Sequence, residues 1–95
     1  MVIENAIFTK NIQLKNYPNP FNQATTIEYI LPQQSSVTLH IYNVIGQLQK
    51  TLVQNETMEA GVHTVNFDRG ALAPGTYFYQ LLVEDKMITQ KMMIN

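Results

Sequence analysis

The chain has 95 residues, a net charge of −1 and no cysteine. A chain of this length forms one domain with one core, which leaves little room for a deep catalytic cleft. The balanced charge gives no basic field that would collect phosphates, so we expect no nucleic-acid partner. The absence of cysteine excludes a disulfide scaffold and a thiolate metal site. No stretch approaches the roughly 20 apolar residues of a membrane span.

The first residues show no periodic pattern, and they lack the basic and apolar regions of a signal peptide. We expect residues 1–13 to be a linker, or a segment foreign to the natural protein, and residues 14–95 to form the domain. If the parent protein is exported, its signal should lie upstream. Pro18, Asn19 and Pro20 end the first extended piece. Because proline fixes φ, the two prolines predict a rigid junction between linker and domain.

The next part of the chain alternates apolar and polar residues with a period of two, which is typical of half-buried strands. Residues 25–31 and 37–41 show this pattern. Residues 43–46 then predict a hairpin loop in which Gly46 takes a positive φ.

The stretch that follows is less regular. Leu48 and Leu52 share a face with Lys50 between them, so a strand over residues 48–53 is expected to carry a bulge or to lie at a sheet edge. Residues 54–60 are polar and are predicted to be a loop.

The last third of the chain returns to clear alternation. The residues expected on the core face are Val65 and Phe67, then Tyr77, Tyr79, Leu81 and Val83, and last Ile88, Met92 and Ile94. Turns at 68–70, 73–75 and 84–86 separate these runs. About seven short strands at a spacing of roughly 8–12 residues predict an all-β, immunoglobulin-like or fibronectin-III-like antiparallel β-sandwich.

No set of residues forms a workable catalytic constellation, so we expect a protein that is not an enzyme and holds no metal or cofactor. His40 falls on the polar face of its strand, whereas His63 is expected to be a hydrogen-bonded structural histidine at the rim of the core. The acids are scattered, and no loop has the spacing of a calcium site. Tyr42 and Phe78 are out of phase with the core residues, which predicts a second apolar face or an exposed patch.

Several segments together resemble a known family. They are Tyr17–Asn22, Thr26–Pro32, Val37–Asn43 with Gly46 and Gln47, Ala60–Val65, Leu72–Tyr79 and Lys91–Met93. In this order they resemble the C-terminal sorting domains of the type IX secretion system of Bacteroidetes. The same pattern is related to the immunoglobulin-like domain of the flagellar hook-capping protein. The resemblance covers residues 14–95.

This resemblance implies a β-sandwich that acts as an address at the end of a secreted cargo protein. The type IX secretion machinery would recognise the folded domain and bring the cargo to the outer membrane surface or the extracellular space. A sortase-like protease on the surface would then remove the domain. The residues expected to be recognised by the machinery are Pro18, Asn19, Pro20, Gly75, Tyr77, Lys86, Lys91, Met92 and Met93.

Two of these expectations concern the last strand. Lys91 is out of phase with Met92 and should be exposed, and a strand with free backbone groups can be read by pairing as well as by charge. Plain protection of a sheet edge against aggregation explains Lys86 and Lys91 equally well. An exposed edge also predicts that two copies can pair as a dimer.

Two other functions fit the composition. The first is a structural or adhesive spacer module, because residues 72–77 also resemble the fibronectin type III corner in which a tyrosine hydroxyl binds the backbone. The second is a carbohydrate-binding module of a secreted enzyme, which would need an exposed row of aromatic side chains.

Overall fold

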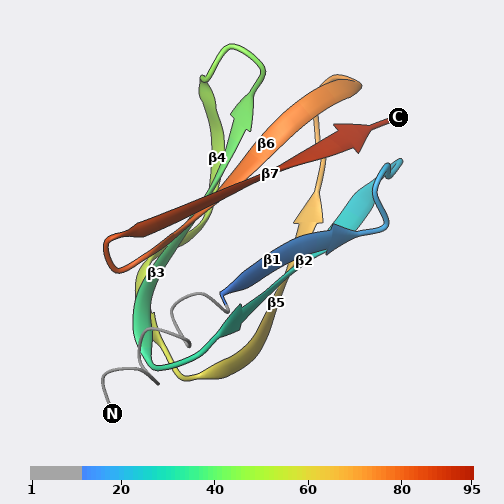
Figure 1. Cartoon of the computed structure of the whole chain (residues 1–95). Helices are drawn as coiled ribbons and strands as arrows, with labels where there is room; N and C mark the ends of the chain where they lie inside the picture. The colour runs from blue at the N-terminus through green and yellow to red at the C-terminus, as the bar shows by residue number, and fades with distance from the viewer. Residues whose placement is uncertain (1–11) are drawn as a thin grey trace.

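The computed structural model describes residues 12–95, and seven strands form its two sheets (Figure 1). The strands are β1 (Gln13–Tyr17), β2 (Ala24–Leu31), β3 (Ser35–Asn43), β4 (Leu48–Met58), β5 (Gly61–Asp68), β6 (Gly75–Val83) and β7 (Lys86–Ile94). Most of the linker predicted over residues 1–13 lies outside the described residues.

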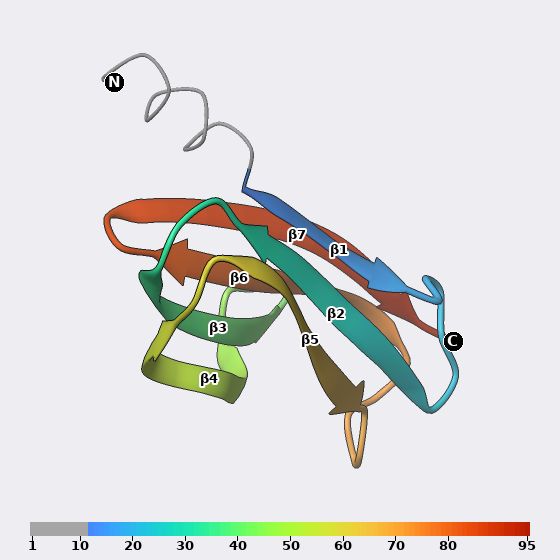
Figure 2. The same ribbon diagram turned by 90° about the horizontal axis from the view of Figure 1, so that it is seen from below.

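Sheet order follows a sandwich topology. Strands β1-β2-β5 form one sheet and β4-β3-β6-β7 form the other, and all neighbours pair antiparallel. The connections β1–β2, β3–β4 and β6–β7 are hairpins within a sheet, whereas the other three cross between sheets, as in immunoglobulin-like sandwiches. Figure 2 shows the two sheets from below. The predicted all-β sandwich is confirmed.

The core lies between the sheets, where the inward residues of each strand meet. In β2, β3 and β6 every second residue is buried, as the alternation predicted. The largest fully buried side chains include Tyr29, Tyr79, Phe21 and Phe67. Hydroxyl groups inside this core are satisfied: Tyr77 donates to the Ala73 carbonyl at 2.7 Å and Tyr79 to Asn16 Oδ1 at 2.9 Å. The Tyr77 bond is the one expected from the resemblance of residues 72–77 to the fibronectin type III corner.

Strand β4 corrects the sequence-based expectation of a loop over residues 54–60. The strand continues to Met58, and only Glu59 and Ala60 connect it to β5. Its pairing with β3 contains three register shifts, and Asn55 has a φ of +51°. These bulges break the alternation that the sequence would have shown, although the backbone pairing persists. The expected edge position of β4 is confirmed.

The bulges also change which residues of β4 face the core. Leu48 is 52% exposed and Leu52 is half-buried, whereas Val53 is buried. Leu48 and Leu52, which the alternation places on one face, therefore differ in burial, because each register shift turns the strand relative to β3.

Two buried tyrosines predict a loss of stability at alkaline pH. Burial raises the pKa of Tyr79 to about 12, and burial together with the charge of Glu56 raises the pKa of Tyr29 to about 12. An unfolded tyrosine titrates near pH 10. Between about pH 10 and 12 the unfolded chain therefore releases protons that the folded chain retains, so stability is full below pH 10 and falls as pH rises.

The melting temperature, followed by circular dichroism from pH 9 to pH 12, measures this effect. The variant with both Tyr29→Phe and Tyr79→Phe should show a shallower decline than the parent over this range, whatever its starting stability. Equal slopes would contradict the assignment.

Candidate recognition surface

The turn between β1 and β2 lies against the end of β7 and completes its free edge. The Asn19 side chain acts as a short piece of strand: its Nδ2 donates to the Lys91 carbonyl at 3.2 Å, and its Oδ1 accepts from the Met93 amide at 3.0 Å. The amide thus pairs with two outward backbone groups of β7 as a neighbouring strand would.

Phe21 continues this pairing with its own backbone. The Phe21 amide donates to the Met93 carbonyl at 3.0 Å, and the Asn95 amide donates to the Phe21 carbonyl at 2.8 Å, which makes a parallel bridge. Its ring is 2% exposed and meets Phe67 edge to face, with ring centroids 6.1 Å apart. We call the contacts between residues 18–22 and residues 91–95 the clasp.

Two further contacts complete the clasp. Arg69 Nη1 donates to the carbonyls of Asn22 and Asn95, both at 3.1 Å. The Asn95 side chain donates to Asn22 Oδ1 at 3.2 Å. The loop after β5 therefore holds both halves of the clasp together.

The clasp belongs to a longer seam between β1 and β7, which lie side by side in Figure 2. Gln90 Nε2 donates to the Leu14 carbonyl at 3.2 Å, so the two edge strands are joined across the sheets. The seam closes one open side of the sandwich, which limits unwanted pairing along it.

Pro18 and Pro20 are exposed and flank Asn19 in the turn. The Pro18 carbonyl accepts a hydrogen bond from the buried Thr25 hydroxyl at 2.8 Å, which ties the turn to β2. The expected rigid junction between linker and domain is wrong, because β1 precedes the prolines and pairs with β2. The prolines end β1, as predicted, but they shape a turn inside the domain.

Gly75 and Tyr77 support the clasp from β6. Gly75 has a φ of +146° and pairs with Ile94, while Tyr77 pairs with Met92. A φ in this range suits glycine, since a Cβ there is strained. Tyr77 is buried with its hydroxyl occupied, so it positions β7, whereas Gly75 is half-buried and shapes the backbone beside Ile94.

The expected residues of β7 divide into buried and exposed ones. Met92 is 1% exposed and belongs to the core, whereas Met93 is 43% exposed and Lys91 points outward as predicted. A partner that binds the folded domain can therefore touch Lys91 and Met93 but not Met92.

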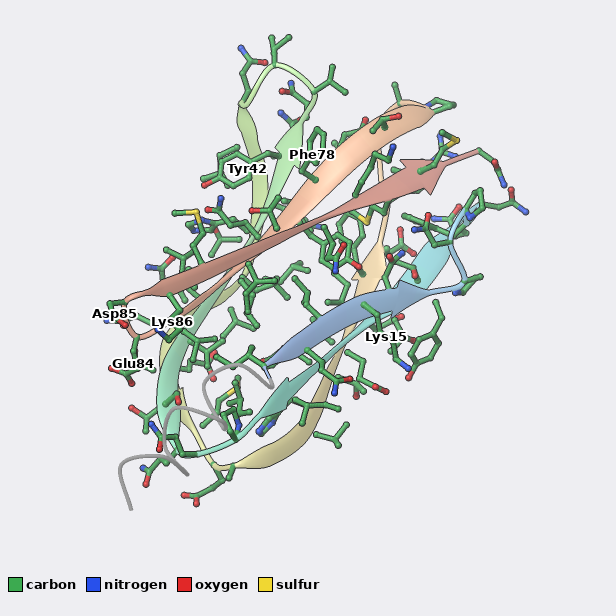
Figure 3. The ribbon with its side chains drawn as sticks, viewed as in Figure 1. Lys15, Tyr42, Phe78, Glu84, Asp85 and Lys86 are labelled. Atoms are coloured by element: carbon green, nitrogen blue, oxygen red, sulfur yellow. The ribbon has the colours of Figure 1, made fainter. Side chains whose placement is uncertain are left out.

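Lys86 lies at the other end of β7, beside the Glu84-Asp85 turn, and does not join the clasp (Figure 3).

Strand β7 has fewer unpaired backbone groups along its outer edge than the sequence predicts. The clasp occupies the Lys91 carbonyl, the Met93 amide and carbonyl, and the Asn95 amide. Alternate residues of a strand face the same edge. Among residues 12–95, the outward backbone groups of β7 without a partner are therefore those of Met87 and Thr89 and the Lys91 amide.

The histidines lie apart from the clasp. His63 is half-buried, stacks on Tyr29 with ring centroids 5.6 Å apart, and has Nε2 2.7 Å from the Glu59 carbonyl, which confirms the structural position predicted for it. His40 Nδ1 lies 3.1 Å from the Tyr42 hydroxyl.

Within residues 12–95, no group of three His, Cys, Asp or Glu could hold a metal ion. No helix in that range could cross a membrane.

Sequence reasoning did not identify Arg69 and Asn95 as site residues, and it placed Phe21 only within a motif. No local signal marks them, because their partners lie far away along the chain. Arg69, for example, reaches Asn22 across 47 positions.

Asn19→Ala should lower the free energy of unfolding by about 1–2 kcal/mol, since two exposed hydrogen bonds to β7 are lost. Asn66→Ala is the matched control, because Asn66 is exposed on β5 and makes no side-chain hydrogen bond among the described residues; it should stay within about 0.5 kcal/mol of the parent. Urea unfolding at 25 °C measures both. Equal stabilities would show that Asn19 does not hold β7.

Fold and clasp together define a small antiparallel sandwich whose last strand is locked by a proline-containing turn. The family model described as a secretion system C-terminal sorting domain matches residues 15–95. The chain belongs to this family and is a C-terminal sorting signal of the type IX secretion system. Its membership implies a secreted protein, a cargo N-terminal to the domain, and interaction with the type IX machinery. No curated protein and no solved structure matches the chain.

Proposed function

We propose that the sorting signal works as a folded, non-catalytic address that the type IX machinery reads at the clasp. The observation that carries this proposal is that residues 18–22 and 91–95 form one surface. Asn19 and Phe21 meet the end of β7 only when the sandwich has closed. A receptor for the clasp would therefore select domains that have finished folding.

The same proposal gives the fate of the cargo. It reaches the outer membrane surface or the extracellular space, where a sortase-like protease removes the domain. A cut N-terminal to β1 would release the cargo and leave all seven strands intact, because β1 is paired along its whole length with β2.

A second copy of the chain is a further partner under this proposal. The outward backbone groups of Met87 and Thr89, with the Lys91 amide next to them, are the part of β7 that can pair with another edge strand. Light scattering at increasing protein concentration tests this pairing, and a strictly monomeric mass would contradict it.

Export is tested by fusing residues 12–95 to the C-terminus of a fluorescent protein that carries a general export signal, in a type IX-competent host. The parent fusion should reach the cell surface or the medium. If it stays periplasmic while an established sorting domain is exported, the proposal fails.

Two lysines on one strand then test where the machinery binds. Lys91→Gln lies at the clasp and should reduce export, whereas Lys86→Gln lies outside it and should leave export unchanged. Both side chains are exposed, so neither change should affect folding. Equal export of the two variants would move recognition away from the clasp.

A further inference from the structure

The loop between β3 and β4 presents two aliphatic side chains to solvent at its tip. Val44 is 63% exposed and Ile45 is 74% exposed, and Leu48 beside them is 52% exposed. The loop stands at the end of the sandwich away from Gln13, where β1 begins and the cargo would be attached (Figure 1).

The loop is rigid although its tip is apolar. The Gly46 amide donates to the Asn43 carbonyl, and the Asn43 amide donates to the Gln47 carbonyl, both at 3.0 Å. Asn43 Oδ1 accepts from the amides of Ile45 and Gln47, and Asn43 Nδ2 donates to Gln47 Oε1. Gly46 supplies the positive φ of +84° that closes this type of hairpin.

None of these hydrogen bonds uses the side chains of Val44 or Ile45. β-Branched residues are also poorly suited to turns, where Asn, Asp, Ser and Gly are favoured. The local fold therefore does not account for two branched aliphatic residues at this position. A rigid apolar projection is the form expected of a binding anchor, since little conformational entropy remains to be lost when it docks.

The tip continues into a shallow groove on the outer face of the four-stranded sheet. Tyr42 and Phe78 form part of its lining, with Gln80 and Thr89 beside them (Figure 3). Tyr42 pairs with Phe78 and Phe78 pairs with Lys91, so one cross-strand row connects the groove to the clasp. These are the two aromatic residues that the sequence predicted to lie outside the core.

The chemistry of this surface indicates its partner. Residues 41–49 contain no Asp, Glu, Lys, Arg or His, so the tip offers nothing to the charged headgroups of a lipid surface. We infer that the Val44-Ile45 tip docks into an uncharged apolar pocket of a protein of the export machinery, which binds the clasp through the same continuous face. This inference rests on the proposed function and adds a second contact to it.

The test replaces Val44 and Ile45 together by Ser in the same export fusion. Val62→Ser is the matched control, because Val62 is 62% exposed on the outer face of the other sheet. Melting temperatures of the purified domains should be unchanged by both substitutions. Export of the double variant should fall about tenfold or more, since two buried aliphatic contacts are lost, whereas export of the control should match the parent.

The outcomes separate the two ideas. A parent fusion that remains periplasmic overturns the proposed function and this inference with it. An exported parent with an equally exported double variant overturns the inference alone. Two other results would also overturn it: binding of the parent to vesicles of anionic phospholipid that the double variant loses, or a parent dimer that the double variant dissolves.

Discussion

Deleting residues 92–95 is expected to unfold the domain. Met92 and Ile94 are each 1% exposed, and they pair with Tyr77 and Gly75 across the last sheet contact. Removing one such side chain typically costs about 2–5 kcal/mol. Losing both approaches the whole stability of a small domain, which is about 5–15 kcal/mol.

Circular dichroism and urea unfolding measure this loss, and the deleted chain should show no cooperative transition at 25 °C. Met93→Ser is the control, since Met93 is 43% exposed between the two buried residues and its replacement should change stability little. A cooperative transition of ordinary midpoint in the deleted chain would show that β7 is an accessory to the fold.

The comparison of Met92 with Met93 also bears on what an export defect means. A deletion that abolishes export does not distinguish a lost fold from a lost signal, because the same four residues complete β7 and belong to the proposed recognition surface. Met93→Ser should keep the fold and changes only an exposed side chain within the clasp. Reduced export of this variant, with an unchanged melting temperature, would place recognition at that side chain.

The alternation of apolar and polar residues correctly predicts the buried residues of β2, β3 and β6, because these strands lie inside the sheets. Strands β2, β3 and β6 each have a neighbour on both sides, and only their two faces differ, so burial follows residue parity. Strand β4 lies at an edge and contains register shifts, so parity breaks within it. Its second half, residues 54–58, buries no side chain fully, so its sequence lacks an apolar alternation and predicts a loop.

The clasp was predicted only in part. The resemblance singled out residues 18–20 and 91–93, but nothing in the sequence indicates that these segments touch. Asn19 and Met93 are 74 positions apart, and their contact depends on how two sheets close on each other. An asparagine that replaces a strand also leaves no periodic trace, because a single side chain makes the pairing.

The apolar tip shows a third limit of sequence reasoning. Val44 and Ile45 were correctly placed in a hairpin loop, since Asn43 and Gly46 have the chemistry that such a loop requires. Their exposure could not be inferred, because aliphatic residues next to a strand are usually buried. Only the arrangement of the loop beyond the sheet shows that they face solvent.

Phe21→Ala is expected to lower the free energy of unfolding by about 3–5 kcal/mol, the usual cost of emptying a buried phenylalanine site. The Phe21 ring fills the core against Phe67, and the same residue's backbone pairs with Met93 and Asn95. Loss of the ring should therefore also loosen the clasp. Phe21→Leu keeps most of the apolar volume and should cost less.

Urea unfolding measures the loss of stability, and hydrogen exchange of single amides locates it. The Asn95 amide, which donates to the Phe21 carbonyl, should lose protection in Phe21→Ala beyond what the global loss of stability explains. The Gly46 amide in the β3–β4 loop serves as the internal reference, because its partner Asn43 lies at the end of β3, and β6 and β7 separate β3 from Phe21. Equal changes at the two amides would mean that the ring only fills space. A selective change at Asn95 would mean that the core and the clasp form one unit, so that the surface proposed as the export address exists only in a domain whose core is complete.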